Sequence, residues 1–313
     1  MLGVRDPRIA VLGAGAVGCF FGGMLARAGM RVTLIGRARH VDAINAEGLF
    51  LDGLRFQERI PVSATTDVSA VRDADIVLFC VKTVDTEQAA KLLGPKALTM
   101  SLQNGVDNVS RIRAATGIEA IPAVVYVAAA MTAPGRVKHS GRGDLVIGDI
   151  WGNDRLQRSL AGIAQMFEHA EVTCRVSENV AGELWTKMII NCAYNAISAL
   201  GRAKYAALVR DELTRDLMRQ VTEEAMAVAR AGGVRLTEGD LMDAVWKIGD
   251  AMAEATSSTA QDIARGKRTE IDSLNGYIVR RGAELGVPTP ANQTLHALVK
   301  LLAGNSHAPA NAR

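Results

Sequence analysis

The stretch Arg8-Ile-Ala-Val-Leu-Gly13-Ala-Gly15-Ala-Val-Gly18 decides the fold of this chain. A short apolar strand runs into a Gly-x-Gly-x-x-Gly loop, and the small apolar residues from Cys19 to Ala28 predict a helix after it. Such glycines allow a tight turn, a close backbone approach to a pyrophosphate and tight helix–strand packing, while the helix N-terminus faces the phosphates. With a second strand at Arg31–Gly36, the sequence predicts a dinucleotide site formed by Gly13, Ala14, Gly15, Ala16, Val17 and Gly18.

Two other interpretations of the apolar run Ile9–Leu25 are excluded by its composition and length. Arg5 and Arg8 before it and Ala26-Arg-Ala28 after it resemble the flanks of a secretory signal peptide. The run contains five glycines, however, which destabilise an apolar helix. It is also shorter than the roughly 20 residues that a membrane-spanning helix needs. We therefore expect neither a signal peptide nor a membrane span.

The end of the second strand indicates which dinucleotide binds. An NAD site usually has Asp or Glu there, which accepts hydrogen bonds from the ribose hydroxyls. Here the strand ends in Gly36-Arg37-Ala38-Arg39, so a guanidinium stands where the carboxylate is expected. Arg37 can pair with a 2′-phosphate through charge-assisted hydrogen bonds, which favours NADP (NADPH). A solvated surface arginine is the alternative interpretation of this residue.

Composition sets the broad class. The chain has 313 residues, enough for two domains, and its 49% hydrophobic and 22% charged residues are typical of a soluble globular protein. A net charge of +3 without a basic run does not indicate a nucleic-acid partner. The five histidines are scattered, and no metal site is expected. Cys19, Cys80, Cys174 and Cys192 lie among apolar residues and indicate reduced core thiols in a cytoplasmic protein.

Strands and helices alternate through the first half of the chain. We predict strands at Asp75–Val81, Ala97–Leu102, Ala120–Ala130 and Glu171–Val176, a hairpin within Leu49–Ala64, antiparallel strands within Met131–Asp149, and helices at Val41–Glu47 and Asn153–His169. Lys82 follows the first of these strands, at the carboxyl edge where doubly wound sheets bind ligands.

From Ser177 onward the pattern is helical. We predict helices at Asn179–Leu200, Asp211–Ala231, Glu238–Ala255, within Thr259–Arg265, Glu270–Leu285 and Pro290–Leu302. The fold class is therefore α/β, with a Rossmann-type doubly wound sheet followed by an all-helical domain. We expect an NADP-binding domain at residues 1–176 and a helical substrate and catalytic domain at residues 177–313.

A polar stripe opens the helical half. Lys187, Asn191 and Asn195 recur at steps of four in an otherwise apolar helix, so they share one face. A buried ammonium and buried carboxamides need partners, because unpaired they cost several kcal/mol. The stripe is either a satisfied seam between packed helices or a surface against which a ligand docks.

Beyond these patterns, the chain resembles the ketopantoate reductase (2-dehydropantoate 2-reductase) family from Arg8 to about Ala303. Three sets of residues carry the resemblance: Gly13–Gly18 with Arg37; Cys80-Val-Lys82-Thr with Gln103-Asn104-Gly105; and Lys187-x-x-x-Asn191-x-x-x-Asn195 with Ser257-Ser258-x-x-Gln-Asp262 and Gly266-Lys-Arg-Thr-Glu270-Ile-Asp272. The third set is specific to the family.

The resemblance implies a role for each matching residue. Lys187 is implied to be the catalytic lysine, which Glu270 holds unless Glu270 instead contacts the nicotinamide side of the cofactor. Asn191 and Asn195 are implied to bind the hydroxyl end of the substrate, and Ser258 its carboxylate. The remaining implied contacts are Asn104 at the junction of cofactor and substrate, Lys82 at the cofactor phosphates or the substrate, and Ala130 in the cofactor pocket. Glu270 near a helix N-terminus and Ser258 as a helix cap are the structural alternatives, and Ser257 and Thr259 compete for the cap.

Two positions depart from the family pattern. Ala255 stands where an asparagine that grips the carboxylate is frequent, and Tyr205 stands where a smaller polar residue is common. The expected activity is NADPH-dependent reduction of a 2-oxo acid, most simply of ketopantoate to pantoate for pantothenate synthesis. The alternatives are a reductase of another 2-oxo acid or ketone and a non-catalytic NADP-sensing protein. The expected partner is a small-molecule 2-oxo acid, with no nucleic acid and no membrane, and a homodimer is left open.

Overall fold

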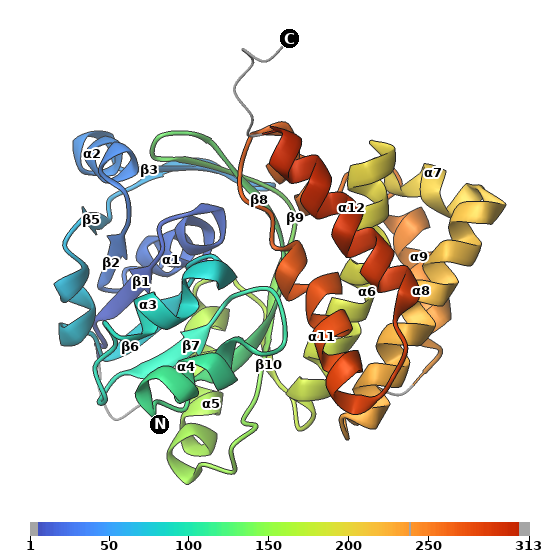
Figure 1. The fold of residues 1–313 in the computed structure, drawn as a ribbon. Helices are drawn as coiled ribbons and strands as arrows, with labels where there is room; N and C mark the ends of the chain where they lie inside the picture. The colour runs from blue at the N-terminus through green and yellow to red at the C-terminus, as the bar shows by residue number, and fades with distance from the viewer. Residues whose placement is uncertain (1–5, 238, 307–313) are drawn as a thin grey trace. The chain divides into compact units, whose positions relative to one another are not determined.

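A computed structural model describes residues 6–237 and 239–306 of the chain. These residues form two compact units, one extending to Val180 and the other beginning at Ala181. Each unit has its own architecture (Figure 1).

The first unit is built on a parallel sheet. Its strands are β1 (Ile9–Leu12), β2 (Val32–Ile35), β5 (Ser63–Thr65), β6 (Ile76–Phe79), β7 (Leu98–Ser101) and β8 (Ile121–Ala133). They lie in the order β8-β7-β6-β1-β2-β5, and every pairing among them is parallel. The chain order reverses between β1 and β6, which is the arrangement of a dinucleotide-binding doubly wound sheet. The Rossmann-type fold expected from the sequence is confirmed.

Four further strands extend this sheet beyond β8. The strand β9 (Arg136–Ile147) is antiparallel to β8, while β3 (Leu49–Asp52) and β10 (Cys174–Val176) both pair parallel to β9. The expected hairpin is confirmed, because β4 (Gln57–Ile60) is antiparallel to β3. The sheet is therefore mixed, with antiparallel strands at the end farthest from β5.

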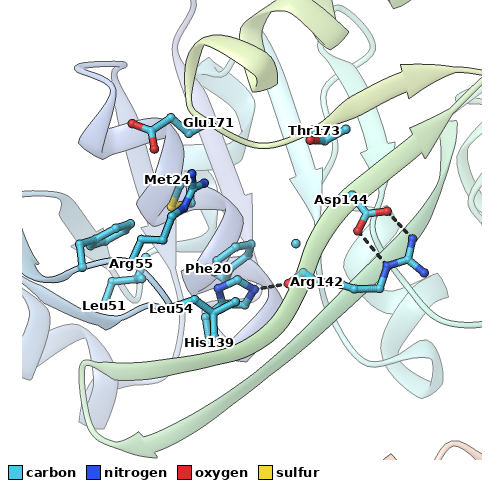
Figure 2. Close-up of a pocket in the computed structure, with 12 residues that line it drawn as sticks. Phe20, Met24, Leu51, Leu54, Arg55, His139, Arg142, Asp144, Glu171 and Thr173 are labelled. Carbon is cyan, nitrogen blue, oxygen red and sulfur yellow. Dashed lines mark hydrogen bonds and ion pairs between the residues drawn. The ribbon is translucent and has the colours of Figure 1, made fainter. Parts of the chain in front are cut away.

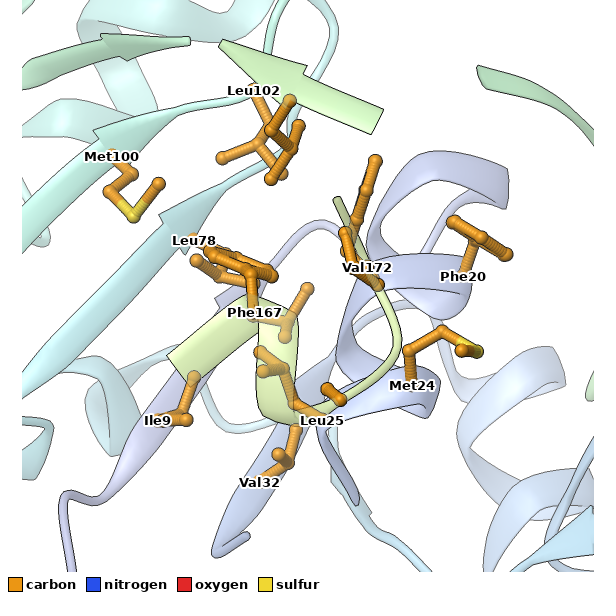
Figure 3. Packing of buried hydrophobic residues seen from close by; sticks show 14 of the residues in the cluster. Ile9, Phe20, Met24, Leu25, Val32, Leu78, Met100, Leu102, Phe167 and Val172 are labelled. Atoms are coloured by element: carbon orange, nitrogen blue, oxygen red, sulfur yellow. The ribbon is translucent and has the colours of Figure 1, made fainter. Parts of the chain in front are cut away.

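Helices cover both faces of the parallel strands. They are α1 (Ala16–Arg27), α2 (Ala38–Glu47), α3 (Thr86–Ala90), α4 (Asn108–Thr116) and α5 (Asp154–His169), with short 3-10 turns η1 (Val68–Asp73) and η2 (Thr83–Asp85). The side chains of β1 alternate between two cores. Ile9 packs with residues of α1 and α5, including Leu25 and Phe167 (Figure 3), whereas Ala10 packs with residues of α3 and α4. This alternation is the period of two expected for a strand buried on both faces.

The second unit is all-helical, as expected. It contains α6 (Val180–Gly201), α7 (Tyr205–Arg210), α8 (Glu212–Ala231), α9 (Leu241–Ala251), α10 (Ser258–Ala264), η3 (Ile271–Ser273), α11 (Asn275–Leu285) and α12 (Pro290–Ser306). Two expectations were wrong in detail. The helix α7 was not predicted, because six residues are too few for a periodic pattern. The expected helix at Glu270–Leu285 is interrupted at Leu274, whose backbone angles (φ −110°, ψ −105°) leave the helical region.

None of the helices within residues 6–237 and 239–306 combines the length and the apolar character that crossing a membrane requires. The same residues bring no group of three or more His, Cys, Asp or Glu side chains together as a metal site would require. The four cysteines are all free thiols, with Cys80 half-buried and the others buried.

Candidate active site

The glycine loop lies between β1 and α1, and its shape depends on the absence of side chains at two glycines. Gly13 has a φ of +110°, and a Cβ there would stand 2.7 Å from the carbonyl carbon of Cys80. A Cβ on Gly18 would stand 2.3 Å from the carbonyl oxygen of Gly13. At Gly15, by contrast, a Cβ would meet no atom within 4 Å. Gly13 and Gly18 therefore shape the loop, whereas Gly15 presents an open backbone surface.

The backbone amides of the loop fall into two groups. Gly13 and Ala14 donate to the carbonyl oxygen of Ile35, over 3.0 and 2.9 Å, and fix the loop against β2. The helix α1 begins at Ala16, and no side chain caps it. The first-turn amides of Ala16 and Val17 have no acceptor within the helix, and together with the helix dipole they suit a phosphate. The residues present thus fit a dinucleotide pyrophosphate.

Arg37 lies at the turn between β2 and α2, as the N-terminal flanking residue of α2. Both Arg37 and Arg39 are exposed, and neither makes an ion pair with any residue that the structure describes. A guanidinium without an acidic partner remains available to an anionic ligand, since its five donors suit a phosphate.

A buried polar network shapes the edge of the sheet after β6 and β7. The carbonyl oxygen of Asn104 accepts from Thr83 Oγ1 (3.0 Å) and from Asn108 Nδ2 (2.7 Å). Gln103 Nε2 donates to the carbonyl oxygen of Val81 (3.1 Å) and to the hydroxyl of Thr86. These bonds fix the backbone of Asn104 at the carboxyl edge of the parallel strands, where this fold binds its ligands.

Lys82 and Ala130 are the two further residues expected to contact the cofactor. Lys82 is half-buried and begins the turn η2 directly after β6. Ala130 lies on β8 opposite Lys138 of β9, well beyond Ile121 and Pro122, where β8 pairs with β7. Lys82 is thus next to Thr83, which bonds the Asn104 carbonyl oxygen, whereas Ala130 lies on the antiparallel part of the sheet.

In the second unit, α6 carries the polar stripe. Lys187 and Asn191 are half-buried, and Asn195 is only 3% exposed. The carboxamide of Asn191 has no hydrogen-bond partner in the part of the chain that the structure describes. The stripe is therefore not a fully satisfied seam, because at least one carboxamide remains open to a ligand.

The structure brings two of the expected substrate residues together. Asn195 Nδ2 donates to the hydroxyl of Ser258 over 3.4 Å, although the two residues are 63 positions apart. The hydroxyl that caps α10 belongs to Ser257, which accepts from the Ala260 amide. Ser258 is therefore not the helix cap; it is an exposed residue whose hydroxyl accepts from Asn195.

Glu270 directly precedes the turn η3, and its carboxylate makes no capping hydrogen bond there. Asp272, inside η3, binds His296 Nε2 (2.7 Å) and Lys300 Nζ (2.8 Å) on α12. Burial raises the pKa of Asp272, but hydrogen bonds from Lys300 and His296 outweigh it and hold that pKa below its usual range. Asp272 thus ties the segment that carries Glu270 to α12.

The two departures from the expected pattern are neighbours in space. The amide of Tyr205 donates to the carbonyl oxygen of Ala255 over 3.0 Å. The Tyr205 ring is buried against Tyr194, with 4.4 Å between ring centroids. Burial raises the pKa of Tyr205 to about 12, so its hydroxyl stays protonated. Both substitutions therefore affect one place, the start of α7 and the segment before α10.

A separate hollow of about 230 Å³ in the first unit contains none of the expected site residues (Figure 2). Phe20, Met24 and Leu51 give it an apolar wall. Arg142 and Glu171 in its lining are paired with Asp144 and Arg27 respectively, while Arg55 and His139 also line it. None of the residues that carry the resemblance lines this hollow, so we do not assign the chemistry to it.

The chain is similar to known proteins along most of its length. Residues 9–152 match the family model described as ketopantoate reductase PanE/ApbA, and residues 179–303 match its C-terminal model. A 2-dehydropantoate 2-reductase of Pyrococcus horikoshii is 34% identical over 94% of this chain and 96% of its own length. The crystal structure of a PanE/ApbA family ketopantoate reductase from Ralstonia eutropha JMP134 is 51% identical, covers 96% of this chain and 100% of its own, and has a TM-score of 0.90. A D-mandelate dehydrogenase solved with NADH and anilino(oxo)acetate shares the fold, with a TM-score of 0.88 at 23% identity and coverage of 96% of this chain and 100% of its own.

Proposed function

The chain belongs to the ketopantoate reductase family of NAD(P)-dependent oxidoreductases, and from this premise we propose that it reduces 2-dehydropantoate (ketopantoate) to pantoate with NADPH. The observation that carries the proposal is the combination, in one chain, of an open glycine loop with an arginine at the end of β2 and of the Lys187–Asn191–Asn195 face with Ser258. The proposed activity is therefore a two-electron reduction of a small 2-oxo acid.

The cofactor is proposed to lie on the first unit. Gly15 and the first-turn amides of Ala16 and Val17 would hold the pyrophosphate, and Arg37 would pair with a 2′-phosphate. Gly13, Ala14 and Gly18 would hold the loop in shape, while Lys82, Asn104 and Ala130 would complete the cofactor site. When bound, NADPH supplies a hydride, which is a proton with two electrons, to the ketone carbon of the substrate.

The substrate groups are proposed to lie on the second unit. Ser258 would hold the substrate carboxylate, and Asn191 and Asn195 would bind the hydroxyl end. The resemblance also implies Asn104 as a donor to the substrate. Carboxamides suit this task because each offers two N–H donors and one acceptor oxygen.

Lys187 is proposed to complete the reaction. As the ketone carbon gains a hydride, its oxygen gains negative charge, and the Lys187 ammonium would stabilise that charge and donate the proton. Lysine suits this step because its pKa falls readily on burial, whereas arginine keeps its proton. Glu270 would hold the ammonium in place, since a nearby carboxylate favours the charged form of lysine. The product is then the 2-hydroxy acid and NADP⁺.

A direct assay tests the proposal. Purified protein is mixed with NADPH and a panel of 2-oxo acids that includes ketopantoate, and the loss of absorbance of NADPH is followed. We expect the highest kcat/KM with ketopantoate. Lys187→Ala serves as the inactive control, so that background oxidation is subtracted.

A second candidate is a reductase of a different 2-oxo acid or ketone. Ala255 and Tyr205 favour it, because they alter the segment before α10 that bears Ser258. Higher kcat/KM with another member of the panel would select this candidate. NADPH binding without turnover of any panel member would instead indicate an NADP-sensing protein.

A further inference from the structure

Ser257 is completely buried, and it joins the two substrate residues of the second unit. Its hydroxyl donates to the carbonyl oxygen of Asn195 over 3.0 Å and accepts from the amide of Ala260 over 3.1 Å. The first bond reaches α6, and the second caps α10. One hydroxyl therefore connects the helix that carries Asn195 to the helix that begins with Ser258.

A second bond strengthens this connection. The amide of Ser257 donates to Ser198 Oγ over 3.2 Å, and Ser198 Oγ donates to the carbonyl oxygen of Ala203 over 2.8 Å. Ser198 has no exposed surface either. Both the side chain and the backbone of Ser257 are thus held by α6, so the position of the next residue, Ser258, is fixed relative to Asn195.

The segment that precedes Ser257 is also held. The amides of Tyr205 and Ala206, in the first turn of α7, donate to the carbonyl oxygens of Ala255 and Ala253, over 3.0 and 3.1 Å. The chain before α10 is therefore hydrogen-bonded to α7 through Ala253 and Ala255 and to α6 through Ser257. With alanine at position 255, this position offers no carboxamide to a ligand, and Ser258 is the exposed serine of the segment whose hydroxyl bonds the Asn195 side chain.

We propose that Ser257 is a positioning residue, which sets the spacing between Ser258 and Asn195 and so determines the affinity for the carboxylate end of the substrate. This inference rests on the proposed function, in which those two residues bind the 2-oxo acid. Ser257 is not a catalytic residue, because a fully buried side chain cannot touch a substrate. Its loss should change the affinity for the 2-oxo acid while leaving the affinity for NADPH unaltered.

The test compares Ser257→Ala with Asp211→Ala as a matched control. Asp211 caps α8 in the same unit by accepting from the Thr214 amide, and it has no bond to Asn195 or Ser258. Both substitutions remove one helix cap, and Ser257→Ala, which also removes a buried hydrogen bond to α6, should lower the Tm by more. Steady-state kinetics are measured with NADPH and ketopantoate, or with the panel member of highest kcat/KM if that is another 2-oxo acid.

We expect Ser257→Ala to raise the KM for the 2-oxo acid about tenfold, with the KM for NADPH unchanged and kcat within about threefold of the parent. Asp211→Ala should leave all three unchanged. Ser257→Thr, which keeps the hydroxyl, should restore most of the affinity. If both Ser257→Ala and Asp211→Ala left the KM for the 2-oxo acid unchanged, Ser257 would be only a cap and the inference would be overturned.

A double-mutant cycle shows whether Ser257 acts through Ser258. In a Ser258→Ala background, Ser257→Ala should raise the KM by no more than about twofold, because the group it positions is already absent. A full tenfold rise in that background would contradict the inference. If neither Ser258→Ala nor Ser257→Ala changed the KM, the proposed substrate site itself would be wrong. If only Ser258→Ala raised the KM, the site would stand and only the positioning role of Ser257 would be wrong.

If Ser257→Ala does not fold, Ser198→Ala takes its place. This variant leaves the Ser257 amide without its acceptor but keeps the cap of α10. We expect a KM for the 2-oxo acid about threefold above the parent, with NADPH affinity unchanged. An unaltered KM in a folded Ser198→Ala protein would contradict the inference.

Discussion

Lys187 is the residue on which the proposed chemistry most directly depends. It stands on α6 one turn before Asn191, whose carboxamide is open within the described part of the chain. Because an ammonium both stabilises a developing alkoxide and supplies its proton, Lys187→Ala should lower kcat by roughly 10²–10⁴. Lys187→Arg should recover only part of this, since arginine is a poor acid. Isothermal titration with NADPH should give the same affinity for the parent and both variants, and activity within a few-fold of the parent in Lys187→Ala would identify another group as the acid.

At the scale of one residue, we propose that Arg37 sets the preference for NADPH over NADH. Its guanidinium is exposed and makes no ion pair with the described residues, so its loss should barely disturb the fold. A charge-assisted bond to a 2′-phosphate is worth roughly 1.5–3 kcal/mol, so Arg37→Ala should weaken NADPH binding about ten- to a hundredfold. NADH binding should change little. Arg39→Ala is the matched control two residues further along the chain, and equal affinities of the unmodified protein for NADPH and NADH would show that Arg37 does not select the cofactor.

The sequence pattern identified the polar stripe of α6, but it did not identify Ser257 as the residue proposed to position Ser258. Lys187, Asn191 and Asn195 stand out because polar groups at steps of four interrupt an apolar helix. Ser257 could not be distinguished from Ser258 in this way. Adjacent serines have the same composition, and only the fold shows that one is buried as a cap while the other is exposed.

At the scale of the element, the glycines in the loop between β1 and α1 differ in what surrounds them. A Cβ on Gly18 would collide with the backbone of Gly13, whereas a Cβ on Gly15 would meet nothing within 4 Å. Gly18→Ala should therefore lower the Tm by several degrees through overpacking. Gly15→Ala should keep the Tm within about 2 °C and raise the KM for NADPH at least about tenfold, because the methyl group occupies the pyrophosphate approach. Thermal melts and NADPH titrations of both variants test this division, and an unchanged NADPH KM in Gly15→Ala would move the pyrophosphate away from this loop.

Element types were predictable where a continuous apolar run marked a buried strand, and less so where a short helix depends on tertiary contacts. The strands β6 and β7 are continuous buried runs, so their sequences indicated parallel strands directly. The six-residue helix α7 was missed, because its burial depends on contacts with α8 and α9 rather than on its own periodicity. The break at Leu274 was missed for the same kind of reason. Asp272 just before it binds two residues of α12, a tertiary contact that local propensity does not contain.

The molecule consists of two compact units, and each unit contains at least one cysteine whose labelling can follow its unfolding. Cys19, Cys80 and Cys174 belong to the first unit and Cys192 to the second. Burial raises the pKa of Cys19 and of Cys174 to about 12, with a smaller contribution from Glu168 at Cys174, and burial also raises the pKa of Cys80 and Cys192. Since only the thiolate reacts, all four should resist a thiol reagent at pH 8 until the unit that contains them opens.

We therefore expect urea-dependent thiol labelling, read for each cysteine by mass spectrometry, to follow the unfolding of each unit. A ligand that binds only the folded state at about 100 times its Kd stabilises that state by about 2.7 kcal/mol. With a urea m-value of about 2–3 kcal/mol/M, NADPH should raise the labelling midpoint of Cys19, Cys80 and Cys174 by about 1 M. The same experiment with Arg37→Ala at the same NADPH concentration should show a smaller rise, because less of the protein is then liganded. Midpoints of these three thiols that do not move with NADPH would mean that the dinucleotide is not held by the first unit, and the assignment of its glycine loop would be wrong.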